Sequence, residues 1–511
     1  MTTAYLLPLI APIALLLTAV LCVRSEKWWS QLAEGAAFFA LLVAVTSFGV
    51  LIWMGPGASP YLILPTRLDL LSAIMLMLVS FVGWIVLRYA ATYLDGEPRQ
   101  GPFTAWMCAT LASVLMLVQS DHLIQLGAAW IATSFFLQKL LLFYADRTGA
   151  QRAARKKFVV SRLSDIAVIA AFFLLAIGYG TGNISEIISA AKTGNAPQTV
   201  VWAVGFLAIA ALLKSAQFPT HGWLTEVMET PTPVSALLHA GVINAGGFLL
   251  LRFADVLVLA PWVMAFLVMI GGFTALFGGI VMLTQSAVKT SLAWSTIAQM
   301  GFMIMQCGLA LFPLALLHIV AHSLYKAHAF LSSGGAVRIV TDLHRPGPIA
   351  VPNVWAVTKA FAIAIAIYAL LAVPFGFADK SAQTIALGAI LIFGVAYLLA
   401  QGMAGAAPYR LMRKTVMYSL AAALGYFTLQ TGAEWAMAET FPATPQPGAL
   451  EWTMIVLAVG SFGLIAVAQA MLPLWAHKPW ARHLRIHATN GFYVTAAFDR
   501  LVWAWSLRKS V

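Results

Sequence analysis

Long apolar runs separated by short polar breaks dominate this sequence of 511 residues. A helix needs about 20 mainly apolar residues to cross a hydrocarbon core of roughly 30 Å, and most of the runs reach that length. The pattern therefore predicts an all-α polytopic membrane protein with about fifteen transmembrane helices. The predicted spans are 4–23, 32–54, 69–92, 102–119, 122–144, 159–180, 199–218, 233–252, 261–283, 291–310, 312–335, 354–374, 383–404, 411–431 and 452–473.

The basic residues between the spans predict the orientation of the chain, because cytoplasmic loops carry an excess of lysine and arginine. With the N-terminus outside, most basic residues fall into inward loops. These are Arg24, Lys27, Arg99, Arg147, Arg152, Arg155, Lys156, Lys157, Lys289, Arg338, Arg345, Arg410, Arg413, Lys414, Lys478, Arg482 and Arg485. The outward loops hold little more than Arg67, Lys192, Arg252 and Lys380. The net charge of +12 is therefore mostly topological and does not require a nucleic acid partner.

The composition agrees with a multi-pass protein of the cell inner membrane. Only 9% of the residues are charged, against roughly 25% in a soluble domain. The first apolar run, Leu6 to Val23, is longer than the apolar region of a signal peptide and lacks a small-residue cleavage site. We therefore interpret it as a first span. The three cysteines are scattered and form neither a zinc spacing nor a disulfide framework.

A first group of titratable side chains surrounds a predicted helix break. Lys214 lies deep in a span, one turn before Pro219, and proline breaks a helix by removing a backbone hydrogen bond. Interrupted membrane helices line cavities or face other protein, where a lysine can exchange protons. Glu226 and Glu229 follow at i, i+3 spacing, and His239 lies inside the next span. The alternatives are a Lys214 that snorkels to the interface and a His239 that is a hydrogen-bonded core residue.

A second group is defined by helical spacing. His318, His322 and Lys326 recur at i, i+4 and i+8, so they share one face of a single helix over about 12 Å. Histidine titrates near neutrality, so this stack can pass protons from one group to the next. His328 points to another face. A metal site and a purely structural polar stripe are the alternatives, but no carboxylate or cysteine is near in sequence to complete a metal site.

Six further residues are possible accessory groups: Glu226, Glu229, Lys139, Asp165, Lys359 and Gln401. Lys139 lies about one turn from the inner end of its span and could snorkel. Asp165 is spaced i, i+3 from Arg162, so the two could simply pair. The chain lacks a dinucleotide-binding glycine pattern, a phosphate-binding loop, an iron–sulfur cysteine set and a nucleophile elbow. We therefore expect a transporter subunit rather than an enzyme, with no metal and no cofactor.

The C-terminal segment from Asn490 to Lys509 is amphipathic. Its apolar side chains recur near helical spacing, with acidic and basic residues between them. This is typical of a helix that lies on the cytoplasmic face or docks on a partner. The alternative is an ordinary C-terminal anchor.

Three sequence stretches resemble a known family. They are KSAQFPTHGWLTEVMETPTPVSALLHA (214–240), TSLAWSTIAQMGFM (290–303) and HIVAHSLYKAHAFLSSG (318–334). All three resemble the proton-translocating membrane subunits of respiratory complex I (subunit L or 5 type) and Mrp-type cation/proton antiporters. The resemblance implies two inverted five-helix repeats with interrupted helices, at 102–255 and 256–405. N-terminal helices at 1–101 precede these repeats, and C-terminal helices with an amphipathic helix follow at 406–511. It also implies that Lys214 is the central lysine, that His239 is a bridging histidine, and that His318, His322 and Lys326 connect to the second repeat.

Two departures from the family pattern change the picture. The family carries a glutamate after the tryptophan of the fifth span, whereas Trp130 is followed here by Ile131. The long lateral helix of the complex I subunit is also missing. A shorter chain with these features resembles the membrane subunits of the Dab-type inorganic carbon systems. That resemblance implies a proton-conducting subunit with a large peripheral, zinc-containing, carbonic-anhydrase-like partner on the cytoplasmic face. A complex I subunit and a sodium/proton antiporter are the alternatives.

Overall fold

The computed structural model describes residues 2–23, 29–59, 64–194, 196–335, 353–403 and 409–503. The described part is almost entirely helical, apart from a two-residue antiparallel ribbon of β1 (Gly57–Ala58) and β2 (Arg67–Leu68). The sequence positions Arg24, Lys27, Arg338 and Arg345, and those after 503, lie outside the described residues.

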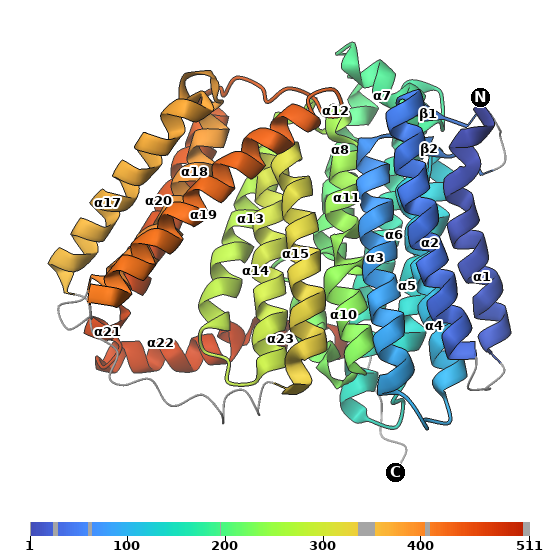
Figure 1. The fold of residues 1–511 in the computed structure, drawn as a ribbon, viewed down its shortest axis with the longest axis horizontal. Coiled ribbons are helices and arrows are strands. Elements are labelled where there is room, and N and C mark those ends of the chain that lie inside the picture. Colours follow the sequence, from blue (N-terminus) through green and yellow to red (C-terminus); the bar gives the residue numbers. More distant parts are fainter. Residues whose placement is uncertain are drawn as a thin grey trace.

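The N-terminal half is a bundle of long helices that stand side by side (Figure 1). It contains η1 (Thr2–Leu9), α1 (Ile10–Cys22), α2 (Trp29–Met54), α3 (Leu70–Tyr93), α4 (Gln100–Gln119), α5 (Leu123–Leu141), α6 (Thr148–Tyr179), α7 (Ile184–Lys192) and α8 (Gln198–Lys214). Buried apolar side chains of these helices form one continuous core with α10 to α15. The all-α membrane fold expected from the sequence is confirmed.

Helices occupy all fifteen predicted span ranges, and among the described residues eleven are long and apolar enough to cross a membrane. The helices in the four other ranges are α5, α8, α14 (Val288–Gly308) and α19 (Tyr409–Ala436). Of these, α8 is only 17 residues long. The count of fifteen spans and the side that the N-terminus faces stay predictions.

The helix carrying Lys214 is interrupted directly after that residue, as its proline predicted. The chain leaves α8 at Lys214 and resumes as the short helix α9 (Gly222–Glu226) and η2 (Val227–Glu229). The next span is also bent. It runs as α10 (Thr232–Ala240), η3 (Val242–Asn244) and α11 (Ala245–Arg252), with Gly241 outside helical geometry at φ −121° and ψ −76°. A short α12 (Ala254–Leu257) follows.

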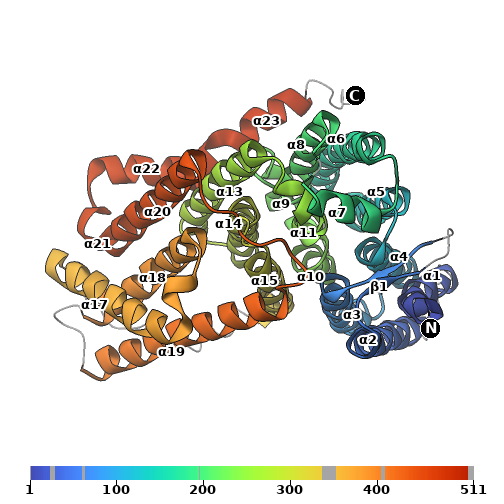
Figure 2. The same cartoon turned by 90° about the horizontal axis from the view of Figure 1, so that it is seen from above.

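The C-terminal half contains a second group of tilted helices (Figure 2). Its members are α13 (Pro261–Met282), α14, α15 (Phe312–Ser332), η4 (Ser333–Gly335), α17 (Val354–Ala372), η5 (Val373–Phe375), η6 (Phe377–Asp379), α18 (Ala382–Gly402), α19 and α20 (Ala449–Ala470). Glycines let α13 and α14 approach closely, since a Cβ on Gly301 would lie 2.6 Å from the Gly271 carbonyl oxygen. In the described part of 256–405 each helix runs without an internal break, so an interruption in the second repeat stays a prediction.

The chain ends in short helices at the end of the molecule opposite the N-terminus (Figure 1). They are α21 (Leu472–Trp475), α22 (Pro479–Thr489), η7 (Gly491–Tyr493) and α23 (Val494–Trp503). Both α22 and α23 lie across the ends of the spanning helices, along one long edge of the molecule (Figures 1 and 2). Phe492 adopts a positive φ of 50° between them, which turns the chain.

A cluster of charged side chains joins the start of α3, the start of α7 and the end of α11. Arg252 Nη1 lies 2.5 Å from Asp69 Oδ2, and Arg67 Nε lies 2.7 Å from the same oxygen. Asp121 accepts a 2.6 Å hydrogen bond from Ser185 Oγ. Burial raises the pKa of the Asp121 carboxyl, although the Ser185 hydrogen bonds and the neighbouring arginines oppose this effect. These contacts tie α3, α7 and α11 together.

Candidate functional site: a line of buried lysines and histidines

Lys214 is buried at the end of α8, where its ammonium group contacts α5. Its Nζ donates a 2.6 Å hydrogen bond to Ser134 Oγ and lies 3.4 Å from the Trp130 carbonyl oxygen. The same Nζ lies 4.4 Å from the centroid of the fully buried Trp130 ring. A cation over an indole face is stabilised by the ring quadrupole. The side chain points into the protein rather than to the interface, so the snorkelling alternative for Lys214 is wrong.

A second buried lysine lies beside Lys214. Lys157 Nζ donates a 2.6 Å hydrogen bond to the Ser134 backbone oxygen, so one serine contacts both ammonium groups. Lys156 and Lys157, expected in an inward loop, instead belong to α6 and are only 3% and 4% exposed. The loop interpretation was wrong because α6 begins at Thr148, well before its apolar stretch. Sequence reasoning thus missed Lys157 as a site residue.

Asp165 of α6 is the carboxylate whose negative charge acts on both lysines. It is 4% exposed, pairs with Arg162 Nη2 at 2.7 Å and interacts through its charge with both Lys214 and Lys157. The predicted i, i+3 pair with Arg162 is therefore confirmed. Residues 157, 161 and 165 follow i, i+4, i+8 spacing on α6. The helical-face rule applied to His318 would have found this face as well.

A small cavity adjoins Lys214. It is lined by Ser134, Leu137, Lys157, Ser161, Leu213, Lys214, Trp223, Leu238, Val242 and Ile243. The cavity therefore extends from the lysine pair to α9 and to Leu238, the residue before His239. Glu226 forms an ion pair with Lys156 of α6, and Glu229 lies 3.5 Å from Arg147 Nη1 with about half of its side chain exposed. The two accessory glutamates thus pair with basic residues next to the cavity and are not among its lining residues.

His239 and Lys326 meet at the helix α14. His239 Nδ1 lies 3.0 Å from Thr296 Oγ1, and Thr296 Oγ1 donates to the Leu292 carbonyl oxygen at 3.0 Å. Lys326 Nζ donates to that same oxygen at 3.0 Å. Both His239 and Lys326 are fully buried. The structure therefore brings together the histidine of α10 and the lysine of α15, which the sequence placed in separate groups.

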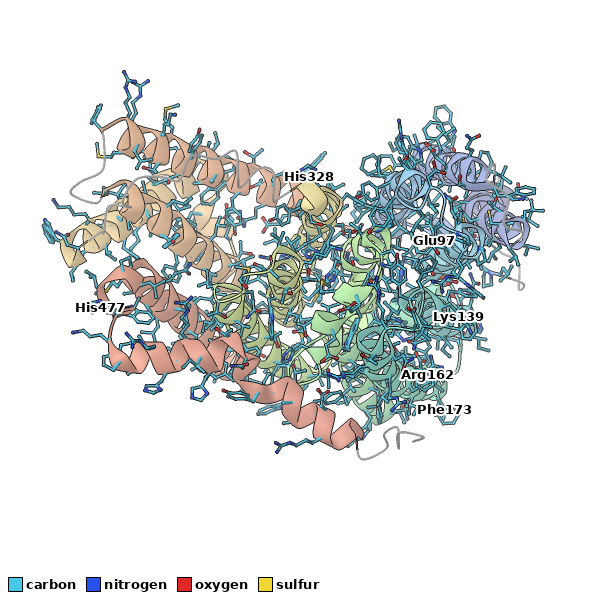
Figure 3. The ribbon with its side chains drawn as sticks, turned by 90° about the horizontal axis from the view of Figure 1, so that it is seen from below. Glu97, Lys139, Arg162, Phe173, His328 and His477 are labelled. Carbon is cyan, nitrogen blue, oxygen red and sulfur yellow. The ribbon has the colours of Figure 1, made fainter. Side chains whose placement is uncertain are left out.

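On the predicted face of α15, His322 and Lys326 are buried and His318 is half-buried, whereas His328 is exposed. His322 is 5% exposed, and its ring centroid lies 6.1 Å from that of His318. Neither ring nitrogen of His322 has a hydrogen-bond partner among the described protein atoms. His328 is exposed and lies at the rim of the molecule (Figure 3). The helical phase assigned to the three residues is confirmed.

Two of the accessory candidates lie away from this line. Lys139 is exposed near the rim of the molecule and lies 5.5 Å from the Phe135 ring (Figure 3). Lys359 is exposed on α17 and lies 5.0 Å from the Trp355 ring. Both contacts suit snorkelling side chains, so the structure does not bring these lysines to the site. Gln401 belongs to α18, and its side chain lies outside the described set.

The distal half contains a polar cluster that sequence reasoning also missed. Lys380 Nζ lies 3.4 Å from Glu434 Oε2, and the Gln430 amide donates to Glu434 Oε1 at 3.2 Å. Gln430 is 1% exposed and the Lys380 side chain 7% exposed. Glu434 and Gln430 are spaced i, i+4 on α19, which was a usable signal.

The site places a series of titratable side chains inside an apolar bundle. Buried titratable side chains in membrane helices are costly and typically mark ion or proton routes. The residues form two groups: Lys157 and Lys214 meet at Ser134, and His239 and Lys326 meet at α14, with His322 and His318 further along α15. Among the described residues, no group of three or more His, Cys, Asp or Glu side chains could hold a metal ion.

Two family models match the sequence. The model described as "NADH:quinone oxidoreductase/Mrp antiporter, TM" matches residues 120–345. The model described as "NADH-Ubiquinone oxidoreductase (complex I), chain 5 N-terminus" matches residues 59–104. The first match includes every residue of the lysine and histidine line.

Curated relatives and solved structures give the same picture. The chain is 35% identical to the probable inorganic carbon transporter subunit DabB2 of Halothiobacillus neapolitanus, over 98% of this chain and 94% of that protein. It is 32% identical to NADH-quinone oxidoreductase subunit L of Mycobacterium tuberculosis, over 78% and 63% of the two chains. A chain of the Mrp complex from Dietzia sp. has the same fold, with a TM-score of 0.59, 23% identity, and coverage of 96% and 56%.

Proposed function

Because the chain belongs to the family of antiporter-like membrane subunits that includes the DabB inorganic carbon transporter subunits, we propose that it conducts protons to drive inorganic carbon uptake. It is a multi-pass inner-membrane transporter subunit, and its relatives work within multi-subunit complexes. The observation that carries the proposal is the line from Lys157 and Lys214 through His239 to Lys326, His322 and His318, of which all but the half-buried His318 are buried. Proton-motive force is the energy source that such a line can use.

Two observations favour a carbon transporter over the other members of this family. The relative that matches nearly the full length of both chains is named as an inorganic carbon transporter subunit, whereas subunit L is matched over 63% of its length. The fifth-span glutamate of the redox and antiporter types is replaced by Ile131. In its place, Trp130, Ser134 and Asp165 surround or compensate the charge of Lys214.

The chemistry on inorganic carbon belongs, in this proposal, to a partner subunit. The Dab-type resemblance implies a large peripheral, zinc-containing, carbonic-anhydrase-like protein on the cytoplasmic face. The end of the molecule that carries α9, η2, α22 and α23 offers a surface for it, because that end joins the interrupted segment to exposed basic residues such as Arg482 and Arg485. A proton flux can drive a partner only through contacts that differ between two states of a shared element.

The test combines purification with transport. The tagged protein is purified in mild detergent, the proteins that accompany it are identified, and bicarbonate uptake by expressing cells is measured with and without an uncoupler. We expect a zinc-containing partner and uptake that the uncoupler abolishes. Lys214→Ala should abolish this uptake while the protein remains in the membrane at wild-type levels.

Other outcomes would contradict the carbon assignment. Co-purification with quinone-reducing subunits would favour the proton-pumping subunit of an NADH:quinone oxidoreductase-like complex. Sodium-dependent proton exchange without carbon uptake would favour an Mrp-type antiporter subunit. Normal carbon uptake by the Lys214→Ala variant would remove this lysine from the route.

A further inference from the structure

The C-terminal helix α23 contacts the interrupted segment that follows Lys214. Lys156 of α6 forms ion pairs with Glu226 of α9 and with Asp499 of α23. Its side chain is only 4% exposed, whereas those of Glu226 and Asp499 are 24% and 28% exposed. One buried ammonium group therefore links three elements, of which α9 is the first helix after the break.

A close backbone approach accompanies this charge contact. A Cβ on Gly222 would lie 2.8 Å from Thr495 Cγ2 and 3.3 Å from Thr495 Cβ. With Thr495 in place, only glycine at position 222 allows α23 to lie this close to the start of α9. The Phe492 ring lies 5.8 Å from that of Phe277, which in turn contacts the buried His221 ring at 5.3 Å. Polar and apolar contacts thus hold η7 and α23 near residues 221–226.

We propose that Asp499 is a positioning residue for the lysine site: through Lys156 it holds α9, and with it the α9 wall of the cavity beside Lys214, in the conducting arrangement. Trp223 of α9 lines that cavity together with Lys157 and Lys214. A shift of α9 therefore changes the surroundings of both lysines. The functional part of this inference rests on the proposed proton route, whereas the contact itself does not.

The size of the effect follows from the charges. A hydrogen bond to a charged group contributes about 1.5–3 kcal/mol, so loss of the Asp499 contact should raise the local opening of α9 by roughly tenfold or more. In Asp499→Asn, Lys156 keeps Glu226 as an ion-pair partner, so its ammonium group is not left unpaired. The protein should therefore still fold and insert.

The experiment uses the full chain with its partner and four variants. Asp499→Asn removes the charge, Asp499→Glu restores it, and Arg500→Gln is the matched control because Arg500 is the exposed neighbour on the same helix. The fourth variant combines Asp499→Asn with Gly222→Cys and Thr495→Cys, so that a disulfide can join α9 to α23. The Cβ atoms at 222 and 495 lie near the distance that a disulfide requires, and the three native cysteines are buried. Amide hydrogen exchange of residues 222–231 and proton flux in proteoliposomes are measured before and after oxidation.

We expect Asp499→Asn to speed exchange of the 222–231 amides about tenfold and to lower the maximal flux by a similar factor. Its pH profile should keep its shape, Asp499→Glu and Arg500→Gln should behave as wild type, and the oxidised disulfide should restore both readouts. Unchanged exchange in Asp499→Asn would overturn the proposed contact, whether or not the protein conducts protons. Faster exchange with normal flux, or a flux that the disulfide does not restore, would overturn the positioning role.

Discussion

The hydroxyl of Ser134 is the sharpest single test of the lysine site. Its oxygen accepts the 2.6 Å hydrogen bond from Lys214, while its backbone oxygen accepts the bond from Lys157. Ser134→Ala removes only the first of these contacts. The Trp130 ring, 4.4 Å from the Lys214 ammonium, remains in place. The substitution therefore destabilises the protonated form of Lys214, while the other contacts of its ammonium group remain.

The expected magnitude follows from that one bond. A hydrogen bond between a charged donor and a neutral acceptor contributes about 1.5–3 kcal/mol, which corresponds to a population change of roughly 10- to 150-fold. If protons pass through Lys214, the flux in Ser134→Ala should fall within this range. A residual flux should persist, because the cation–π contact with Trp130 still contributes on the order of 2 kcal/mol. Lys214→Ala, in contrast, should leave none.

Thr133→Val is the matched control for this measurement. Thr133 is the adjacent buried residue on α5, and its hydroxyl donates to the Ala129 carbonyl oxygen within the same helix at 2.8 Å. Both variants are reconstituted at equal protein density, and the proton flux under an imposed membrane potential is followed with a pH-sensitive dye. Equal flux in the two variants would refute the reasoning, because it would mean that the Lys214–Ser134 bond does not influence transport.

Two further predictions concern other parts of the molecule. His322→Ala should reduce proton flux at least tenfold more than His328→Ala at matched expression, because only His322 lies on the buried face of α15. Equal losses would mean that helical phase is irrelevant. Arg252→Met should lower stability by about 3 kcal/mol, because it leaves the buried Asp69 carboxylate with fewer partners. Adding Asp69→Asn should recover part of that loss in thermal unfolding of the detergent-solubilised protein. A wild-type unfolding temperature for Arg252→Met would show that the pair adds nothing to stability.

Sequence reasoning could predict the features that depend on neighbours along the chain. The break after Lys214 follows from Pro219, which removes a backbone hydrogen bond within the span. The burial of His322 and the exposure of His328 follow from helical spacing alone. Both predictions use only the geometry of one helix, and for that reason they hold.

The contacts between distant segments could not be predicted in the same way. Lys156 pairs with Asp499, which is 343 positions away, and no periodicity in either segment names the other as its partner. Lys157 was assigned to a loop because positive charge next to an apolar run normally marks a loop. Its burial depends on α6 extending beyond the apolar stretch and on the Ser134 carbonyl oxygen that accepts its bond. Helical spacing gives the face of a helix, whereas tertiary packing decides what that face meets.

If protons pass through Lys214, the pair of buried lysines offers a physical account of how they do so without the fifth-span glutamate. Both ammonium groups donate to Ser134 at 2.6 Å, and the span of one serine then limits their separation to roughly 9 Å. At an effective dielectric constant of about 20, two unit charges at that distance repel each other by about 2 kcal/mol. Asp165, which also pairs with Arg162, is the carboxylate whose charge acts on both lysines, so one anion faces two cations. In the proposed route, a proton that arrives on Lys157 would therefore favour release from Lys214 toward His239. Repulsion between like charges can thus replace the attraction that a glutamate would supply, and a partner that shifts α9 can set when the release occurs.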